Sequence, residues 1–522
     1  MGIYLNPLSD LFEEAVSSEI YVDKTDLIRY TNSIFRTQQK YICVSRPRRF
    51  GKSMTANMLA AYYSRGVDAR ALFAGLSVAG ADTFEKYLNK FDVLSVNMQD
   101  FLSRTKGIEE LIARLKDRLL RELLNAYPGE YLDKEDLAET MAEIYASTRR
   151  PFVVISDEWD CVFREYRQDS HAQDEYLDFL RDWLKDKAYI GLAYMTGILP
   201  IKKYGTHSAL NMFNEFSMTN PGELASFVGF TEDEVRVLCG KYHRDFNRMK
   251  QWYDGYKFPG EDSVYNPRSV VSALTSGIFD TYWNKTESFE ALRIYLDMDM
   301  YGLREKIIRL LAGEPEKVDT RTFVNDMTTF AKADDVLTLM IHLGYLAYDF
   351  EQEEVCIPNQ EIQREYVSAM STGGWEEIFR SIEQSQALLQ AVWECDEEAV
   401  AKGMQRAHFE TSHLQYNDEN ALSYTISLAL YAARQQYTIV RELPAGKGFA
   451  DIVLVPRPQY GSIPGIIVEL KWNKEADTAV EQIMRQKYPL ALEKFAGDLL
   501  LVGVSYDKKT KEHHCKITRM KK

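Results

Sequence analysis

The sequence contains few cysteines, and they are not arranged as pairs. The six cysteines lie far apart and include no C-x-x-C motif. Disulfide frameworks and structural zinc sites both depend on recognisably paired cysteines. We therefore expect buried thiols in a reducing compartment, and neither a disulfide scaffold nor a zinc cluster. These residues are Cys43, Cys161, Cys239, Cys356, Cys395 and Cys515.

Long apolar runs are also missing. The best candidate, residues 190–201, is shorter than the roughly 20 residues that a helix needs to cross a bilayer. The N-terminal sequence MGIYLNPLSDLFEE lacks a basic start followed by an apolar core, so we expect no secretory signal. These two absences predict a cytoplasmic protein without a membrane partner.

Positive charge is outnumbered over the whole chain. The 522 residues include 63 Lys and Arg against 78 Asp and Glu, which gives a formal net charge of −15. This balance argues against a protein that coats nucleic acid through a basic surface, although it leaves room for a local basic groove. With 45% apolar and 27% charged residues, the composition is that of a folded protein of roughly three or four domains.

The N-terminal part alternates between strand and helix patterns. Alternation of this kind predicts a parallel α/β sheet. Strands are predicted at 40–45, 91–98, 151–160 and 189–197, and helices at 53–64, 108–127, 134–147 and 174–186.

Two changes of pattern follow. Helical patterns dominate from about 223 to 343, and Asn266 before Pro267 predicts a turn or a helix start. The last hundred residues predict the order α-β-β-β-α-β. Its helices are expected at 419–435 and 477–495, and its strands at 437–443, 449–455, 465–472 and 497–507.

The stretch SRPRRFGKS (residues 45–53) ends like a phosphate-binding loop. In such a loop, backbone N–H groups at a helix start face the β-phosphate, the lysine reaches the β- and γ-phosphates, and the next hydroxyl binds Mg²⁺. Lys52 and Ser53 can fill these roles, and Gly51 allows close backbone approach. Arg46 stands where the motif normally begins with glycine, so the alternative is a polar loop that opens a helix.

A second acidic motif lies downstream in VVISDEWD (residues 153–160). Asp157 at a strand end can hold Mg²⁺ with its water shell, and Glu158 can orient the attacking water. Together with the Gly-Lys-Ser triplet, these acids favour nucleotide binding over a solvated strand end. Arg46, Arg48 and Arg49 have two interpretations, namely phosphate contacts or charges that compensate for the missing glycine.

The chain resembles the bacterial AAA-ATPase-like proteins that carry a C-terminal PD-(D/E)xK-type nuclease domain. The resemblance covers nearly the whole chain and rests on five segments in a fixed order. They are YVDKTDLI, SRPRRFGKS, VVISDEWD, YMTGILPI and YNPRSVVSAL.

This resemblance implies that Arg46 is the family's own form of the loop. It also implies a polar γ-phosphate sensor at Thr196 and a family signature at Asp23-Lys24-Thr25, close to the nucleotide. Arg268 departs from the aromatic residue expected after Asn-Pro, and we favour a surface residue over a sensor arginine. The implied nucleotide contacts are Arg48, Arg49, Phe50, Gly51, Lys52, Ser53, Met54, Asp157 and Thr196.

A second group of charged residues lies near the C-terminus. Strand alternation puts Glu469 and Lys471 on one face, and Asp451, eighteen residues upstream, can approach Glu469 in a hairpin. Two carboxylates and a backbone carbonyl form a Mg²⁺ site, beside which Lys471 can activate water for phosphodiester hydrolysis. Glu419 is a candidate third carboxylate. Gln482 and Lys487 are candidates for contact with the phosphate backbone of a nucleic acid. The alternative is an ordinary cross-strand ion pair.

Asp451, Glu469 and Lys471 in this order of elements resemble the PD-(D/E)xK nuclease core. One departure is Gly448-Phe449-Ala450-Asp451, where the family often has Gly-Arg-x-Asp. The lost arginine implies weaker contact with a nucleic-acid backbone. A degenerate nuclease fold that only binds therefore stays the alternative to an active nuclease.

These observations predict an α/β chain with a P-loop AAA-type parallel-sheet domain (1–222), a helical lid region (223–400) and a restriction-endonuclease-like domain (401–522). The resemblance implies ATP hydrolysis coupled to a Mg²⁺-dependent nuclease-fold domain acting on DNA, with Mn²⁺ as the second candidate ion. The rivals are a nucleotide-dependent switch or scaffold and an ATPase acting on protein partners, and homo-oligomerisation is left open. The catalytic candidates are Asp451, Glu469, Lys471, Glu419 and Glu158, and the metal candidates are Ser53, Asp157, Glu419, Asp451 and Glu469.

Overall fold

The structure is a computed structural model that describes most of residues 2–521. The description leaves out residues 202–209, 284–289, 299, 301, 325–326, 328, 371–374, 411–429, 446–447, 458–462, 473–474, 486–496, 508 and 511.

The chain divides into two compact units. The first comprises Met1–Ser288 and Glu316–Arg364, and the second comprises Phe289–Pro315 and Glu365–Lys522. Residues 223–400, predicted to be a separate lid region, are thus shared between the two units. The three-part division at 222 and 400 stays a prediction.

A parallel five-stranded sheet forms the centre of the first unit. The strand order is β2 (Asp92–Asn97), β3 (Phe152–Asp157), β4 (Ile190–Gly197), β1 (Tyr41–Ser45) and β5 (Asn214–Phe216), and every neighbouring pair is parallel. All residues of β1, β3 and β4 are buried, as expected for apolar strands covered on both faces. The carboxyl ends of parallel strands lie at one edge, where both N-terminal motifs begin.

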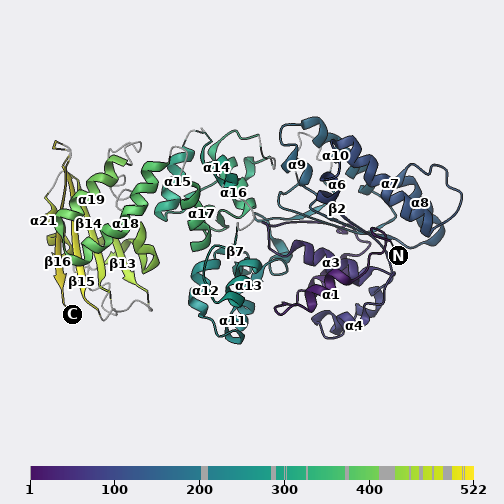
Figure 1. Cartoon of the computed structure of the whole chain (residues 1–522), viewed down its shortest axis with the longest axis horizontal. Helices are drawn as coiled ribbons and strands as arrows, with labels where there is room; N and C mark the ends of the chain where they lie inside the picture. Colours follow the sequence, from purple (N-terminus) through teal and green to yellow (C-terminus); the bar gives the residue numbers. More distant parts are fainter. Residues whose placement is uncertain are drawn as a thin grey trace. The chain divides into compact units, whose positions relative to one another are not determined.

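Helices cover both faces of this sheet. Figure 1 shows α1 and α3 on one side, and α7 and α10 on the other. Helix α7 buries Leu111, Leu115 and Leu119, whose spacing of four residues gives the helix one apolar face. The helices of this part are α1 (Asp10–Val16), α2 (Asp26–Ile34), α3 (Lys52–Tyr63), α4 (Arg70–Phe73), η1 (Ser77–Gly80), α5 (Phe84–Tyr87), α6 (Met98–Leu102), α7 (Ile108–Ala126), α8 (Leu137–Thr148), α9 (Cys161–Glu165) and α10 (Ser170–Leu184).

The rest of the first unit combines short helices with two small sheets. Helix α13 begins at Pro267, and the side chain of Asn266 accepts hydrogen bonds from the backbone N–H groups of Arg268 and Ser269. This confirms the predicted helix start. The helices are η2 (Gly222–Leu224), α11 (Glu232–Lys241), α12 (Phe246–Tyr253), α13 (Pro267–Ser276), η3 (Thr320–Thr322), α16 (Ala333–Leu343) and the start of α17 (Gln360–Met370).

The two small sheets were not predicted. Their orders are β6-β8-β7 and β10-β11-β9. Strands of two to five residues are too short to show a clear alternation in the sequence. The strands are β6 (Phe230–Thr231), β7 (Tyr256–Phe258), β8 (Glu261–Tyr265), β9 (Glu316–Lys317), β10 (Ala347–Asp349) and β11 (Glu354–Cys356).

The second unit is built on a mixed five-stranded sheet in the order β12-β13-β14-β15-β16. The pair β14 and β15 is parallel, and the other neighbouring pairs are antiparallel. The strands are β12 (Tyr437–Ala445), β13 (Gly448–Pro456), β14 (Gly465–Trp472), β15 (Leu499–Asp507) and β16 (Glu512–Met520).

Helices pack on both faces of this second sheet. Val468 and Leu470 share an apolar cluster with α18 and α19, whereas Val453 and Ile467 pack with α21 on the opposite face. Figure 1 shows the same arrangement. The helices of this unit are α14 (Glu290–Leu296), α15 (Leu303–Ala312), α18 (Glu376–Glu394), α19 (Glu397–Glu410), η4 (Tyr431–Gln435), α21 (Ala476–Arg485) and the end of α17.

Each helix or strand predicted from the sequence is found as such in the described residues, with three qualifications. The strand predicted at 151–160 ends at Asp157, because Glu158 adopts a positive φ of 55° and turns the chain into α9. The helix predicted at 477–495 is described only as far as Arg485. Most of the helix predicted at 419–435 lies outside the described residues, and its last part is the short 3₁₀ helix η4.

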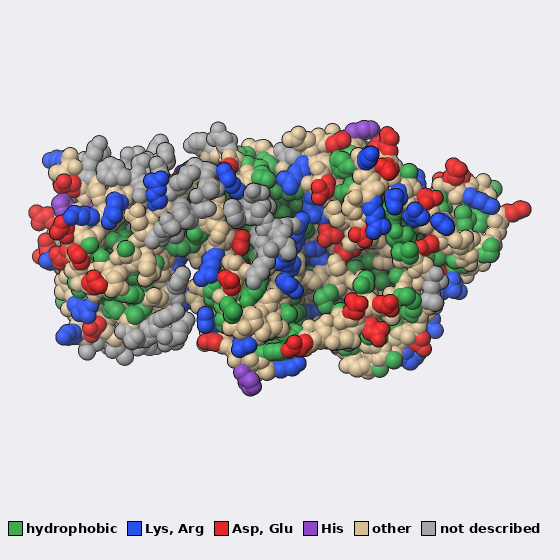
Figure 2. All heavy atoms as spheres, viewed as in Figure 1, with side chains coloured by type: hydrophobic (Ala, Val, Ile, Leu, Met, Phe, Trp, Pro, Cys, Tyr) green, Lys and Arg blue, Asp and Glu red, His purple; other side chains and the backbone are tan. Residues whose placement is uncertain are grey.

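The surface and the thiols can be compared with the composition. Figure 2 shows basic and acidic side chains interspersed over the face in view. The prediction of buried thiols is correct for Cys43, Cys161 and Cys239 but wrong for Cys356, which lies exposed at the end of β11. Cys395 and Cys515 are half-buried.

Within the described residues, no helix is long and apolar enough to span a membrane.

Candidate functional site

The loop between β1 and α3 is shaped as the sequence motif predicts. Gly51 precedes α3 with a φ of 95°, a left-handed conformation that favours glycine. Lys52 is buried, and its ammonium group donates to the backbone carbonyls of Arg46 and Pro47, both at 3.0 Å. Ser53 follows with an exposed side chain that lines a cavity. The loop therefore holds a lysine and a hydroxyl at the N-terminus of a helix.

Arg46 supports this loop from the protein interior. Its side chain is fully buried and donates to the carbonyls of Ser45 and Phe216, both at 3.0 Å. The guanidinium lies 4.9 Å from the centre of the Phe258 ring, and burial lowers the pKa of Arg46 to about 10. Arg46 is not among the residues that line the cavity. These contacts favour a structural role over a phosphate contact for this residue.

The rest of the loop is anchored to the elements around α13. The Asn266 amide donates to the carbonyl of Arg48 at 3.2 Å, and the Arg49 guanidinium donates to the carbonyl of Tyr282. Phe50 is 1% exposed and packs edge-on against Tyr256. The three residues after Pro47 are therefore fixed by the part of the unit that follows the parallel sheet.

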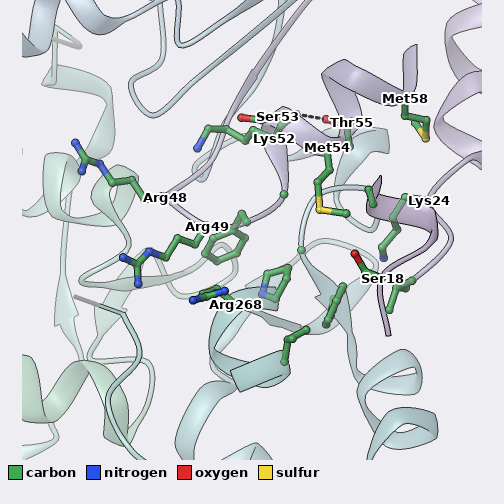
Figure 3. Close-up of a pocket in the computed structure, with 18 of the residues that line it drawn as sticks. Ser18, Lys24, Arg48, Arg49, Lys52, Ser53, Met54, Thr55, Met58 and Arg268 are labelled. Carbon is green, nitrogen blue, oxygen red and sulfur yellow. Dashed lines mark hydrogen bonds between the residues drawn. The ribbon is translucent and has the colours of Figure 1, made fainter. Parts of the chain in front are cut away.

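A cavity of about 1090 Å³ opens at this loop. Its volume is slightly above the range of typical small-molecule sites, about 300–1,000 Å³. Figure 3 shows Lys52, Arg48, Arg49 and Arg268 on one side of the view, and Met54, Met58, Lys24 and Ser18 on the other. Arg268 is solvent-exposed and also lines the cavity, so the surface position predicted for it is compatible with ligand contact.

The acids after β3 lie at the same edge of the sheet. Asp157 is 8% exposed, and its carboxylate accepts hydrogen bonds from Thr196 Oγ1 and from the backbone N–H of Glu158. Glu158 lines the cavity, whereas Asp157 and Thr196 are not among its lining residues. Thr196, predicted as a γ-phosphate sensor, is fully buried behind Asp157. In this state Thr196 orients an acid and does not face the cavity.

Sequence reasoning missed two charged residues at this site. Arg164 on α9 lines the cavity and forms ion pairs with Glu158 and, at 3.4 Å, with Asp160. Asp160 is fully buried and accepts the backbone N–H groups of Ile198 and Leu199 at 3.0 and 2.8 Å. The i, i+4 spacing of Asp160 and Arg164 was the available signal.

Burial is the largest cause of the pKa shifts of Lys52 and Glu158 at this site. Burial lowers the pKa of Lys52, and Glu158, Asp160 and Asp157 oppose this shift. Burial also raises the pKa of Glu158, and the charges of Arg164 and Lys52 act against it. The Lys52 ammonium, which bonds to two neutral carbonyls, suits the polyanionic phosphates of a nucleotide.

The signature Asp23-Lys24-Thr25 reaches the cavity through Lys24. The Lys24 ammonium binds both carboxylate oxygens of Glu234 at 2.6 Å and the carbonyl of Ser226 at 2.7 Å. Asp23 accepts the N–H and hydroxyl of Thr25 and the N–H of Ser77. These contacts tie the N-terminal segment to α11 and η1. A structural role is therefore sufficient to explain the motif, without a part in the reaction.

The C-terminal residues predicted to act together do meet in the second unit. Lys471 donates to Glu469 Oε1 at 2.9 Å, and the carboxylate of Asp451 accepts the backbone N–H of Leu470 at 2.7 Å. Gln482 on α21 also donates to Glu469 Oε1. The helix can approach because the register partner of Glu469 is Gly503, where a Cβ would lie 2.4 Å from the carbonyl of Ala476.

The Glu469 carboxylate is buried with only one of its oxygens hydrogen-bonded by residues that the structure describes. Its side chain is almost fully buried, and its Oε2 atom has no hydrogen-bond partner among the described residues. Burial, with the nearby charge of Asp451, raises the pKa of Glu469 to about 7, although Lys471 acts in the opposite direction. A buried carboxylate oxygen without a donor, next to a second carboxylate, fits a hard divalent ion such as Mg²⁺ or Mn²⁺. Within the described residues, no group of three or more His, Cys, Asp or Glu side chains forms a ready-made metal site.

Two predicted residues of this site cannot be placed. Both lie outside the described residues: Glu419, the candidate third carboxylate, and Lys487, the candidate contact with the phosphate backbone of a nucleic acid.

Comparison with protein families matches two segments of the chain. Residues 10–206 match a family described as "Predicted AAA-ATPase", and residues 419–515 match the PD-(D/E)XK nuclease superfamily. The first segment holds the phosphate loop and the acids after β3. The second holds Asp451, Glu469 and Lys471.

A protein of Azotobacter chroococcum mcd 1, described as an uncharacterized protein in the vnfD 5′ region, is 26% identical over 273 residues. The match covers 51% of this chain and 50% of that protein, so the chain spans about half the length of this relative.

Solved structures give weaker likenesses. The Aeropyrum pernix ORC2 protein in ADPNP–ADP complexes has a TM-score of 0.32 at 12% identity, covering 68% of this chain and 96% of that one. Cdc6p from Pyrobaculum aerophilum has a TM-score of 0.26 at 11% identity, covering 69% and 97% of the two chains. The Aeropyrum pernix ORC1 protein in complex with DNA has a TM-score of 0.22 at 11% identity, covering 69% and 96%. At these scores the likenesses support no inference about function.

Proposed function

Because the chain carries an AAA-ATPase-like domain followed by a C-terminal PD-(D/E)XK nuclease-superfamily domain, we propose that it binds and hydrolyses ATP in its first unit and cleaves DNA phosphodiester bonds in its second. The substrate class DNA and the coupling of the two activities are part of this proposal. The supporting observations differ between the two units.

ATP binding rests on one juxtaposition. Lys52 and Ser53 at the start of α3 share a cavity with Glu158, which follows the buried strand β3. Phosphate oxygens would replace the two loop carbonyls as acceptors for the Lys52 ammonium. Arg48, Arg49 and Arg268 would add charge at the same side of the cavity.

Hydrolysis requires a metal site and a group that orients water. Ser53 and Asp157 are the residues that would hold Mg²⁺, which supplies charge neutralisation on the β- and γ-phosphates when bound. Glu158 would accept a proton of the attacking water and orient its oxygen toward the γ-phosphorus. Thr196 would keep the Asp157 carboxylate in place through its hydroxyl hydrogen bond.

DNA cleavage rests on the arrangement around Glu469. Asp451 and Glu469 would hold a divalent ion, which supplies Lewis-acid activation of a phosphate oxygen and of water when bound. The unpartnered Oε2 atom and the raised pKa of Glu469 support this role. Lys471 would orient the attacking water or stabilise charge on the phosphate, and Gln482 would orient Glu469 or contact the DNA backbone.

The decisive experiment measures cleavage of plasmid, linear and single-stranded DNA with Mg²⁺ or Mn²⁺, with and without ATP. Wild type is compared with Glu469→Ala and Lys52→Ala. Cleavage that disappears in Glu469→Ala supports the nuclease. A response to ATP that disappears in Lys52→Ala supports coupling between the two units. If ATP is hydrolysed but no DNA is cut under any condition, the nuclease part of the proposal is wrong.

A nucleotide-dependent switch or scaffold is the second candidate. Lys471 and Gln482 both bond to Glu469 Oε1, so the polar groups of the site already satisfy one another in part. Phe449 also stands where the related nucleases often have an arginine. DNA binding that weakens steeply with salt, without cleavage, would favour this candidate over both the nuclease and an ATPase acting on proteins.

A further inference from the structure

Glu158 is held in an unusual backbone conformation. Its φ of 55° lies in the left-handed region, which costs a non-glycine residue about 1–2 kcal/mol. Its neighbours are both fixed. Asp157 is buried and accepts the hydroxyl of Thr196, and Trp159 is fully buried and donates its backbone N–H to the carbonyl of Thr196 at 3.0 Å. A strained residue between two anchored neighbours has a backbone set by its surroundings, and such strain is concentrated at functional sites.

One of the two carboxylate oxygens of Glu158 is hydrogen-bonded by the protein. Arg164 Nη2 donates to Glu158 Oε2. The other oxygen, Oε1, has no hydrogen-bond partner among the described residues, and the side chain is 25% exposed where it lines the cavity. The carboxylate therefore has one oxygen held by the protein and one available to a water molecule or ligand.

Arg164 is itself fixed by the end of the sheet. Its side chain is only 9% exposed, and Nε forms an ion pair with Asp160 Oδ2 at 3.4 Å, although Nε makes no hydrogen bond among the described residues. Asp160 is locked by the backbone N–H groups that follow β4, and Gly197 gives it room, because a Cβ there would lie 2.8 Å from Asp160 Oδ1. A third contact joins Arg164 Nη2 to Gln99 at 3.4 Å. The guanidinium is thus a fixed bridge from β4 to Glu158.

We propose that Arg164 is the positioning residue of the ATPase site: it holds Oε2 of Glu158 so that Oε1 faces the water that attacks the terminal phosphate. This inference rests on the proposed ATP hydrolysis and adds a residue to it. Arg164 acts through Glu158 and not through the nucleotide. Its planar guanidinium can donate to Glu158 through Nη2 while its Nε side forms an ion pair with Asp160, which a lysine ammonium does with poorer geometry.

Two other roles for Arg164 predict different kinetics. A direct phosphate contact would weaken nucleotide binding when it is lost. A latch that withholds Glu158 from catalysis would raise the rate of hydrolysis when it is removed. A positioning residue predicts a lower kcat with unchanged nucleotide affinity.

The test compares Arg164→Met, Arg164→Lys, Glu158→Gln and the double variant Glu158→Gln/Arg164→Met with wild type in the full chain. The matched control is Arg181→Met, which removes an arginine paired with Asp178 on the exposed face of α10. The measurements are kcat and KM for ATP and the dissociation constant of a non-hydrolysable ATP analogue. Thermal unfolding of each variant identifies those that are misfolded.

We expect Arg164→Met to lower kcat by about 10- to 100-fold. This is at or below the lower end of the roughly 100- to 10,000-fold that a group transferring the proton contributes, because Arg164 acts only through Glu158. The dissociation constant should change by less than about threefold, and Arg164→Lys should recover part of kcat. Adding Arg164→Met to Glu158→Gln should cause no further loss, because a group that acts only through Glu158 has nothing left to position.

Four results would overturn the inference while leaving ATP hydrolysis intact. They are an unchanged kcat, a raised kcat, a weakened affinity at constant kcat, and a full additional loss in the double variant. If Arg164→Met is misfolded, Arg164→Lys and its combination with Glu158→Gln carry the test. A wild-type protein that binds the analogue but hydrolyses no ATP would instead refute the proposed hydrolysis, and this inference with it.

Discussion

In the first unit, Lys52 bonds to loop carbonyls and Glu158 bonds to Arg164, whereas in the second unit Lys471 and Glu469 bond to each other. Each residue pair combines a lysine and a glutamate beside a buried strand end. In the first site, separate partners hold the two charges at a large open cavity. In the second, the charges are crowded, and one oxygen of the buried Glu469 has no donor within the described part of the chain.

This difference indicates how each site would respond to its ligand. The first site has its charges arranged by the protein alone, so a nucleotide mainly exchanges one set of acceptors for another. The second site carries an unfavourable buried carboxylate that a divalent ion would relieve. We therefore expect the second unit to depend more strongly on metal for stability and activity than the first unit depends on nucleotide.

The largest effect should follow from removing Glu469. We expect Glu469→Ala to reduce metal-dependent DNA cleavage by about 1,000-fold, equivalent to about 4 kcal/mol, because a metal ligand is lost. The measurement is the initial rate of plasmid cleavage in Mg²⁺ and in Mn²⁺. The matched control is Glu481→Ala, an exposed acid on α21. Equal losses in both variants would contradict the assignment of Glu469.

The second prediction concerns pH and stability without metal. The pKa of Glu469 is about 7 in the folded chain, above the ordinary 4.5, so the folded state binds the proton more tightly than the unfolded state. Stability should therefore fall as pH rises from about 4.5 to about 7 and stay lower above that, by up to about 3 kcal/mol. Glu469→Gln should remove this dependence, and Mn²⁺ should raise the unfolding temperature more at pH 8 than at pH 5.5.

Denaturant or thermal unfolding from pH 4.5 to 8.5, with chelator or with Mn²⁺, would check this prediction. The comparison of wild type with Glu469→Gln isolates the residue from other titrating groups. A wild-type stability that rises through the same pH window, relative to Glu469→Gln, would show that the buried carboxylate is already compensated by Lys471.

The third prediction addresses the first site. Lys52→Met should lower ATP hydrolysis by about 100-fold, the usual scale for losing one preorganised electrostatic contact to the reacting group. Its effect on unfolding temperature without nucleotide should be small, because the ammonium donates to two loop carbonyls and forms no ion pair among the described residues. The control is Lys86→Met, an exposed residue of α5. Hydrolysis that survives Lys52→Met would place the nucleotide elsewhere.

The residues that the sequence could predict are those whose chemistry follows from local spacing. Lys52 and Ser53 come from a loop between a strand and a helix, and Glu469 and Lys471 share a face through strand alternation. Their assembly into two sites needed only the expected strands. Their catalytic roles stay predictions until the variants are measured.

The residues that the sequence could not predict depend on distant contacts. Arg46 is buried because it meets Phe216 and Phe258, which lie far away in the chain. Thr196 was expected to face the nucleotide, but its hydroxyl bonds to Asp157 on the neighbouring strand. Arg164 lies on α9, which follows the turn at Glu158, and it reaches Glu158 only once the chain has turned there. Only the i, i+4 spacing of Asp160 and Arg164 is a local signal, and the positions of Arg46 and Thr196 are not encoded in a local pattern.

The smallest predicted effect separates two functions of Asn266. Its Oδ1 atom caps α13, and its Nδ2 group donates to the carbonyl of Arg48 at 3.2 Å. Asn266→Ala should remove both and lower stability by about 1 kcal/mol, typical of a lost helix cap.

Asn266→Asp keeps an acceptor for the cap but loses the donor to the phosphate loop. It should therefore recover stability while nucleotide affinity stays reduced by about threefold, the scale of one neutral hydrogen bond. Affinity equal to wild type in Asn266→Asp would mean that the loop holds its shape without this contact, and that Arg49 and Phe50 anchor it.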